Sequence, residues 1–199
     1  MRRMATILSF LLLLLLGSQA WAGYGMQMVM SGGVAASAVS DGFVGTRAAV
    51  TDSVYQSGND TPHSHYAATT TGTVSYIYVR RYDNSQDMTE TKPAIWSADG
   101  STLLASSTSC TATNPSTNLY RYTLSSPLSI TASTTYTLGY ATGDGNYYPP
   151  YAAGAGAIYI ESGVSHSGCP TINDAVTHDT TFTTDGGLCI WASNDPNES

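Results

Sequence analysis

The chain has 199 residues, a length that suits one domain preceded by a processed segment. Only 11% of the residues are charged, and 14 Asp and Glu against 7 Lys and Arg give a net charge of -7. A nucleic-acid-binding protein needs basic side chains to meet phosphates, so this balance argues against that class. The apolar share of 42% is enough for a buried core and argues against wholesale disorder.

The N-terminal segment has the pattern of a secretory signal peptide. Arg2 and Arg3 precede an apolar run over residues 5–16, and small residues up to Ala22 then suit signal peptidase. The run is shorter than the roughly 20 residues that cross a bilayer. We therefore expect residues 1–22 to be cleaved and the mature chain to be secreted to the extracellular space or cell surface, with no membrane span after cleavage.

The rest of the chain predicts short strands. Apolar residues do not recur at helical spacing, and turn formers appear every few residues. The expected strands are, in chain order, one around Met26, Met28 and Met30, then residues 43–50, 72–82, 92–97, 102–105, 119–124, 134–141, 157–161, 180–184 and 188–192. This spacing predicts an all-β fold, a single antiparallel β-sandwich over residues 23–193, with no substantial helix and a flexible tail at 194–199.

The segment over residues 72–82 is the best candidate strand, because it is dense in β-branched and aromatic residues. Strict alternation places Ser75, Ile77 and Val79 on one face. The other face, which is expected to be partly solvated, carries Val74, Tyr76, Tyr78 and Arg80. Further along, Pro127 is expected to end the strand that begins at residue 119.

Two stretches carry a family resemblance. Residues 92–105 read Lys-Pro-Ala-Ile-Trp-Ser-Ala-Asp-Gly-Ser-Thr-Leu-Leu-Ala, in which Asp99-Gly100 predicts a tight turn between two strands. Residues 120–132 read Tyr-Arg-Tyr-Thr-Leu-Ser-Ser-Pro-Leu-Ser-Ile-Thr-Ala. This pattern resembles a jelly-roll β-sandwich module of bacterial secreted, cell-surface and phage virion proteins, which is similar in architecture to carbohydrate-binding modules. The resemblance covers about residues 72–148 and implies a jelly-roll-like sandwich, since the matched residues mostly serve turns and core.

Three cysteines in an exported chain allow at most one internal disulfide. Cys169 and Cys189 are nearest in sequence, and we expect them to pair, with Cys110 free or bonded elsewhere. A loop of that size contributes about 3 kcal/mol to stability. Neither a C-x-x-C pair nor the spacing of a zinc site is present.

Two segments offer possible metal ligands. In a strand, His63 and His65 would place both rings on one face, which could hold a metal, but a polar loop following residues 59–62 is the favoured interpretation. Asp144 and Asn146 lie in a loop whose oxygens suit calcium, although the spacing of a full twelve-residue calcium loop is missing. Calcium is thus the one candidate cofactor, and none is required.

The tyrosine segment Tyr147-Tyr148-Pro149-Pro150-Tyr151 is the candidate ligand site. Prolines hold the segment extended, so Tyr147, Tyr148 and Tyr151 cannot all turn inward. Tyrosine presents a flat apolar face with a hydroxyl, which suits stacking on sugar rings as well as protein contacts. The alternative is that these tyrosines cover one end of the sandwich.

These features favour an exported, non-catalytic binding module for carbohydrate or cell-envelope glycan. The alternative is a structural or assembly subunit of a surface layer, fibre or adhesin, which would self-associate through edge strands, with Arg80 and Arg81 guarding one edge. A secreted hydrolase is not expected. The segment around Ser165 departs from G-x-S-x-G by one position and lacks the strand-to-helix turn on which that motif depends.

Overall fold

The computed structural model describes residues 42–53, 56–57, 61–82, 88, 90–143, 146–147, 149–161, 168–178, 180–183 and 186–198. Its strands are β1 (Phe43–Gly45), β2 (Asp52–Ser53), β3 (Gln56–Ser57), β4 (Thr61–Ala67), β5 (Gly72–Arg80), β6 (Thr91–Ser97), β7 (Leu103–Ser106), β8 (Thr113–Ser116), β9 (Leu119–Ile130), β10 (Thr135–Thr142), β11 (Asn146–Tyr147), β12 (Pro150–Ala153), β13 (Ile158–Glu161), β14 (Thr180–Thr183), β15 (Gly186–Leu188) and β16 (Ile190–Ser193). In these ranges no helix is long and apolar enough to cross a membrane. The predicted signal peptide and the strand around Met26 lie outside them.

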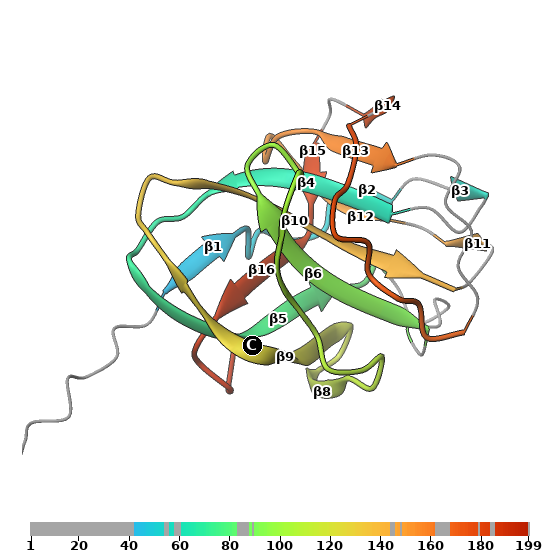
Figure 1. Ribbon diagram of the computed structural model, residues 1–199. Coiled ribbons are helices and arrows are strands. Elements are labelled where there is room, and N and C mark those ends of the chain that lie inside the picture. The colour runs from blue at the N-terminus through green and yellow to red at the C-terminus, as the bar shows by residue number, and fades with distance from the viewer. Residues whose placement is uncertain are drawn as a thin grey trace, which may run out of the picture. The chain divides into compact units, whose positions relative to one another are not determined.

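Two large antiparallel sheets form the fold. One has five strands in the order β1-β16-β5-β9-β8, and the other has six in the order β14-β13-β4-β10-β6-β7. The chain passes from one sheet to the other between consecutive strands, from β4 to β5 to β6 and from β9 to β10 (Figure 1). Two small sheets, β11-β3 and β15-β12-β2, complete the described strands. The predicted all-β sandwich is confirmed.

The main core lies between the two large sheets. The five-stranded sheet contributes fully buried side chains such as Ile77, Val79 and Ile190, and the six-stranded sheet contributes Ile95 and Leu138. Each such side chain contributes about 1.5–3 kcal/mol when it leaves water. Residues at alternate positions of each strand face this core, because successive side chains of a strand point to opposite faces.

The predicted faces of β5 are wrong at the start of the strand. Val74 is fully buried in the main core together with Ile77 and Val79, whereas Ser75 donates a hydrogen bond of 2.6 Å to Asn194 Oδ1. The pairing of β5 with β9 shifts register between Val74 and Tyr76. A bulge adds a residue on one strand and so reverses the alternation beyond it, which a sequence pattern alone does not reveal.

Strand β9 continues through Pro127, contrary to the predicted break. Val74 of β5 lies opposite Leu128, and Tyr76 lies opposite Thr123, so β9 accommodates several extra residues between these pairs. Pro127 falls in this irregular stretch, where its missing N–H removes no hydrogen bond from the ladder with β5.

The outer face of the five-stranded sheet is covered by the end of the chain. Tyr78 stacks on Trp191 with ring centroids 5.2 Å apart, and its hydroxyl donates a 2.5 Å hydrogen bond to the Asp195 carbonyl. Arg47 forms an ion pair with Glu198. The sequence predicts a flexible tail from residue 194, whereas residues 194–198 make these contacts in the structure.

The assembly hypothesis expected Arg80 to guard a sheet edge, but Arg80 does not lie at an edge. It ends β5, which lies between β16 and β9 in the middle of its sheet. Its guanidinium carbon lies 5.5 Å from the centroid of the Trp191 ring, a cation–π contact on the outer face. Arg80 therefore packs within the sheet surface, and the edge strands of this sheet are β1 and β8.

Candidate functional site

The segment over residues 168–178, named here the covering segment, packs on the outer face of the six-stranded sheet. Its Ile172 and Val176 form a small buried cluster with Trp96 and neighbouring alanines of β6 and β10. Trp96 Nε1–H donates to the Asn173 carbonyl at 3.0 Å. In Figure 1 this segment is the red-orange trace near β6 and β10. Trp96 is therefore buried, but outside the core between the two large sheets.

The covering segment also packs against the turn before β7, where the Val176 N–H donates to the Gly100 carbonyl at 2.8 Å. The Asp99 carboxylate accepts hydrogen bonds from the Ser97 hydroxyl and from the hydroxyl and N–H of Ser101, and these bonds lower its pKa to about 2. Gly100 has a φ of 73°, and a Cβ there would lie 2.4 Å from the Val176 carbonyl oxygen. The predicted Asp99-Gly100 turn is confirmed, and glycine is required both by the backbone and by the packing.

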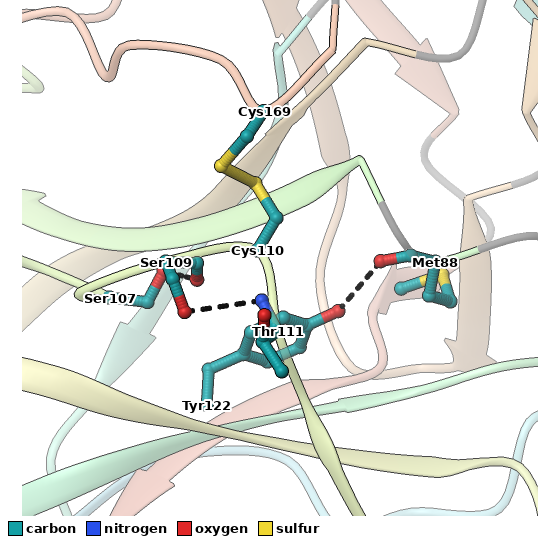
Figure 2. Close-up of a disulfide and its surroundings, with 7 residues drawn as sticks. All are labelled: Met88, Ser107, Ser109, Cys110, Thr111, Tyr122 and Cys169. Carbon is teal, nitrogen blue, oxygen red and sulfur yellow. Dashed lines mark hydrogen bonds between the residues drawn. A yellow bond between two sulfur atoms is a disulfide. The ribbon is translucent and has the colours of Figure 1, made fainter.

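A disulfide fixes the start of the covering segment. Cys110, in the loop before β8, bonds to Cys169, with the two Cα atoms 5.7 Å apart and a sequence separation of 59 (Figure 2). The predicted Cys169–Cys189 pairing is wrong. Cys189 is fully buried between β15 and β16 and has a free thiol. The wrong pairing was predicted because Cys169 and Cys189 are the two cysteines nearest in sequence. The fold instead brings Cys169, in the covering segment, against the loop before β8.

The free thiol of Cys189 should be chemically inert in the folded protein. Burial raises its pKa to about 12, so the reactive thiolate is scarce at neutral pH. We expect iodoacetamide at pH 8 to leave Cys189 unmodified in native protein and to alkylate it in urea, as judged by intact mass. Rapid alkylation of the native protein would contradict this buried placement.

A cavity of about 340 Å³ lies beside the disulfide. It is lined by the polar residues Arg81, Thr111 and Asn114 and by Met88, Cys110, Ala112 and Tyr120. The guanidinium carbon of Arg81 lies 4.9 Å from the centroid of the Tyr120 ring. The cavity, named here the disulfide pocket, thus combines residues that carry hydrogen-bonding groups with one aromatic residue.

Local hydrogen bonds position this lining. The Arg81 N–H donates to the Asn118 carbonyl at 2.8 Å, which fixes the chain as it leaves β5. The Thr111 N–H donates to Ser109 Oγ at 3.2 Å, and the Tyr122 hydroxyl donates to the Met88 carbonyl at 3.3 Å. Figure 2 shows these two bonds close to the disulfide. The pocket is therefore built from backbone that the disulfide and the core hold in place.

A second polar cluster lies on the outer face of the six-stranded sheet. His63 and His65 project from β4, beside Tyr159 of β13 and His178 at the end of the covering segment. His63 Nε2 lies 2.7 Å from His178 Nδ1. Burial, and next the neighbouring His178, lower the pKa of His65. The favoured sequence interpretation of a polar loop is wrong here, because β4 places both rings on one face.

The structure describes only part of the predicted tyrosine site. Tyr151 lies in β12 and packs half-buried against the main core. Tyr147 and Asn146 form β11, which pairs with β3, and their side chains are outside the described parts. Tyr148 and Asp144 lie outside the described residues, so neither the full tyrosine site nor the calcium loop is seen. Across the described ranges, no three His, Cys, Asp or Glu side chains are already arranged to hold a metal ion.

Comparison with known proteins finds a match to a protein-family model. A family model described as a domain of unknown function, DUF4082, matches residues 64–167, about half of the chain. The chain belongs to the DUF4082 family. No curated protein and no solved structure shows a significant match.

In this DUF4082 chain the matched range contains the whole lining of the disulfide pocket, including Cys110. Its disulfide partner Cys169 and the cluster residues His63 and His178 lie outside that range. The sequence interpretation missed the pocket, because its residues come from separate strands and loops. The available signal was Arg81 next to Arg80 at the end of a strong strand, in a chain with few cations.

Proposed function

We propose that this protein is an exported, non-catalytic binding module whose disulfide pocket holds a carbohydrate, such as a cell-envelope glycan. The observation that carries the proposal is the lining of the pocket. A volume of about 340 Å³ is within the range of small-ligand sites, roughly 300–1,000 Å³. The residues Arg81, Thr111 and Asn114, which carry hydrogen-bonding groups, line the pocket together with the apolar or aromatic residues Met88, Ala112 and Tyr120, a combination that suits the mixed polar and apolar surface of a sugar.

Each lining group has a defined use. The Asn114 amide offers both donors and an acceptor, as sugar hydroxyls require, and this side chain is exposed to solvent. The Arg81 guanidinium offers only donors, which suits hydroxyl or carboxylate oxygens and favours an acidic sugar. The half-buried ring of Tyr120 lies under the Arg81 guanidinium and holds that cation at the pocket.

Export is supported by the signal-peptide pattern of residues 1–22 and by the Cys110–Cys169 disulfide. Disulfides persist in oxidising compartments and are rare in the cytosol. The described surface gives less support to the alternative role as an assembly subunit. Among the described residues, Tyr82 and Leu104 are the large exposed hydrophobic side chains, and they are 47% and 37% exposed. They do not make the broad apolar surface that self-association needs.

The test is binding of the mature protein, from Gly23, to an array of neutral and acidic glycans, with and without calcium. We expect Asn114→Ala to weaken binding by roughly three- to tenfold, as loss of one hydrogen-bonding partner does. Arg81→Met should weaken binding to acidic glycans most. Ser116→Ala is the matched control, because Ser116 is exposed on the same strand β8 and does not line the pocket.

The outcomes separate the candidate sites. Weaker binding by Asn114→Ala, with an unchanged melting temperature and an unaffected control, supports the disulfide pocket. Binding that survives both pocket variants but disappears in a Tyr147, Tyr148 and Tyr151 triple alanine variant places the site on the tyrosine segment instead. Absence of binding across the array contradicts the glycan proposal, and sizing chromatography at high concentration then tests assembly.

A further inference from the structure

We propose that His63, His65 and His178 form a binding site for a late first-row transition-metal ion such as Zn²⁺. The donors are Nε2 of His63, Nε2 of His65 and Nδ1 of His178. Imidazole nitrogens suit zinc, copper and nickel. The site lies on the outer face of the six-stranded sheet, and its lining differs from that of the disulfide pocket.

The strand geometry brings two of the ligands together. His63 and His65 alternate on β4, and Tyr159 of β13 pairs with His63. Gly139 of β10 also pairs with His63, and a Cβ there would lie 2.6 Å from the Cβ of His63. Because Gly139 has no side chain, the His63 side chain can lie beside β10 without a steric clash.

The hydrogen bond of His63 fixes its tautomer. Its Nδ1 lies 3.0 Å from the Thr61 carbonyl oxygen, which can only accept, so Nδ1 carries the proton. Nε2 therefore carries the lone pair, and it faces His178 Nδ1 at 2.7 Å. A metal-binding histidine commonly donates its other N–H to a backbone carbonyl in this way.

The same logic applies to His65. Its Nδ1 lies 3.1 Å from Thr137 Oγ1, whose hydroxyl donates to the Ala98 carbonyl at 3.2 Å. The Thr137 oxygen must then accept from His65 Nδ1–H, which leaves the lone pair of His65 on Nε2. The centroid of its ring lies 4.4 Å from that of His178 and 4.9 Å from that of Tyr159. Two strand histidines are thus held by their Nδ1 atoms and keep Nε2 as the nitrogen with a lone pair.

Metal binding requires one local adjustment. Two nitrogens on one tetrahedral zinc ion lie about 3.3 Å apart, whereas His63 Nε2 and His178 Nδ1 are at hydrogen-bond distance. This contact explains why the three rings are close without being arranged as ligands. His178 is exposed at the end of the covering segment, so a rotation of its side chain opens the space. In the contact between His63 and His178, Nδ1–H of His178 donates to Nε2 of His63. When the metal binds, the Nδ1 proton of His178 is lost to solvent and Nε2 of His178 is protonated instead. Nδ1 then coordinates the metal, and the hydrogen bond to His63 is lost.

The consequence for the fold is a second fixed point on the covering segment. The Cys110–Cys169 disulfide holds its start, and a metal shared by β4 and His178 would hold its end. A ligand that binds only the folded state raises stability with its concentration. We therefore expect Zn²⁺ to raise the melting temperature, and EDTA to reverse the effect.

The test is isothermal titration calorimetry of untagged mature protein with ZnCl₂ at pH 7.5, repeated with Cu²⁺ and Ni²⁺. One ion per chain is expected. His178→Ala and His65→Gln should abolish binding, and both lie on the partly exposed side of the cluster, where folding is least affected. Thr137→Ala, which removes the acceptor of His65 Nδ1–H, should weaken binding by roughly 10- to 100-fold.

Two controls make the assignment specific. Tyr159→Phe keeps all three nitrogen donors and should bind normally, and His166→Ala removes the fourth histidine of the chain, which is not one of the three proposed ligands. No heat and no change in melting temperature with any of the three ions would overturn the proposal. Full binding by the His178→Ala and His65→Gln variants, or equal loss in His166→Ala, would also overturn it.

Discussion

Replacing both Cys110 and Cys169 with serine should lower the free energy of unfolding by about 4 kcal/mol. The disulfide closes a loop of 59 residues, and the chain-entropy cost of such a loop in the unfolded state predicts this value. The double variant is preferred to single ones because it leaves no unpaired thiol in the disulfide pocket. Urea unfolding of the two proteins under identical oxidising conditions measures the difference.

Two comparisons check the cause of that loss. Reductant should destabilise the wild-type protein by a similar amount and leave the double serine variant unaffected. Cys189→Ala removes the buried thiol that takes no part in the bond, so this variant should lose as much stability on reduction as the wild-type protein does. Peptide mapping without reductant should recover Cys110 linked to Cys169. A Cys169–Cys189 peptide would refute the connectivity.

Replacing Trp96 with alanine should cost about 4 kcal/mol of stability. The side chain is fully buried between the six-stranded sheet and the covering segment, where large-to-small changes leave a cavity. The variant also loses the hydrogen bond from Nε1 to the Asn173 carbonyl. Besides the shift in urea midpoint, we expect faster proteolysis within residues 168–178, because Trp96 packs against Ile172 and Val176 of that segment.

Milder substitutions separate these contributions. Trp96→Phe keeps an aromatic ring and loses the N–H donor, so it should cost less than the alanine variant. Tyr82→Ala removes a large aromatic side chain that is 47% exposed and should change stability by at most about 0.5 kcal/mol. A Trp96→Ala cost as small as that of Tyr82→Ala would show that the covering segment does not pack on the sheet.

Strand prediction succeeded where the signal was local. The densities of β-branched and aromatic residues that define β5, β6 and β10 reflect preferences of single residues and their nearest neighbours. The errors in β5 and β9 have one cause. A register shift between two strands depends on both partners at once, so neither the placement of Val74 in the core nor the tolerance of Pro127 was visible in either segment alone.

The candidate sites were harder to predict for the same reason. His63 and His65 were noted because they are two residues apart, but His178 comes from a segment 115 residues away from His63. The pocket residues Arg81, Asn114 and Tyr120 likewise come from different elements. The tyrosine segment was predicted as a ligand site because its residues are contiguous in the sequence. Of these residues, Tyr151 packs against the main core.

Composition and local pattern were sufficient to specify an all-β chain with an export signal pattern, since strand propensity and turn chemistry act over a few residues. The disulfide partner, the position of the covering segment and the approach of His178 to β4 were decided only by tertiary structure. These features depend on which distant segments the packing of two sheets brings together. Burial of Trp96, Ile172 and Val176 selects that arrangement, and no single segment encodes it.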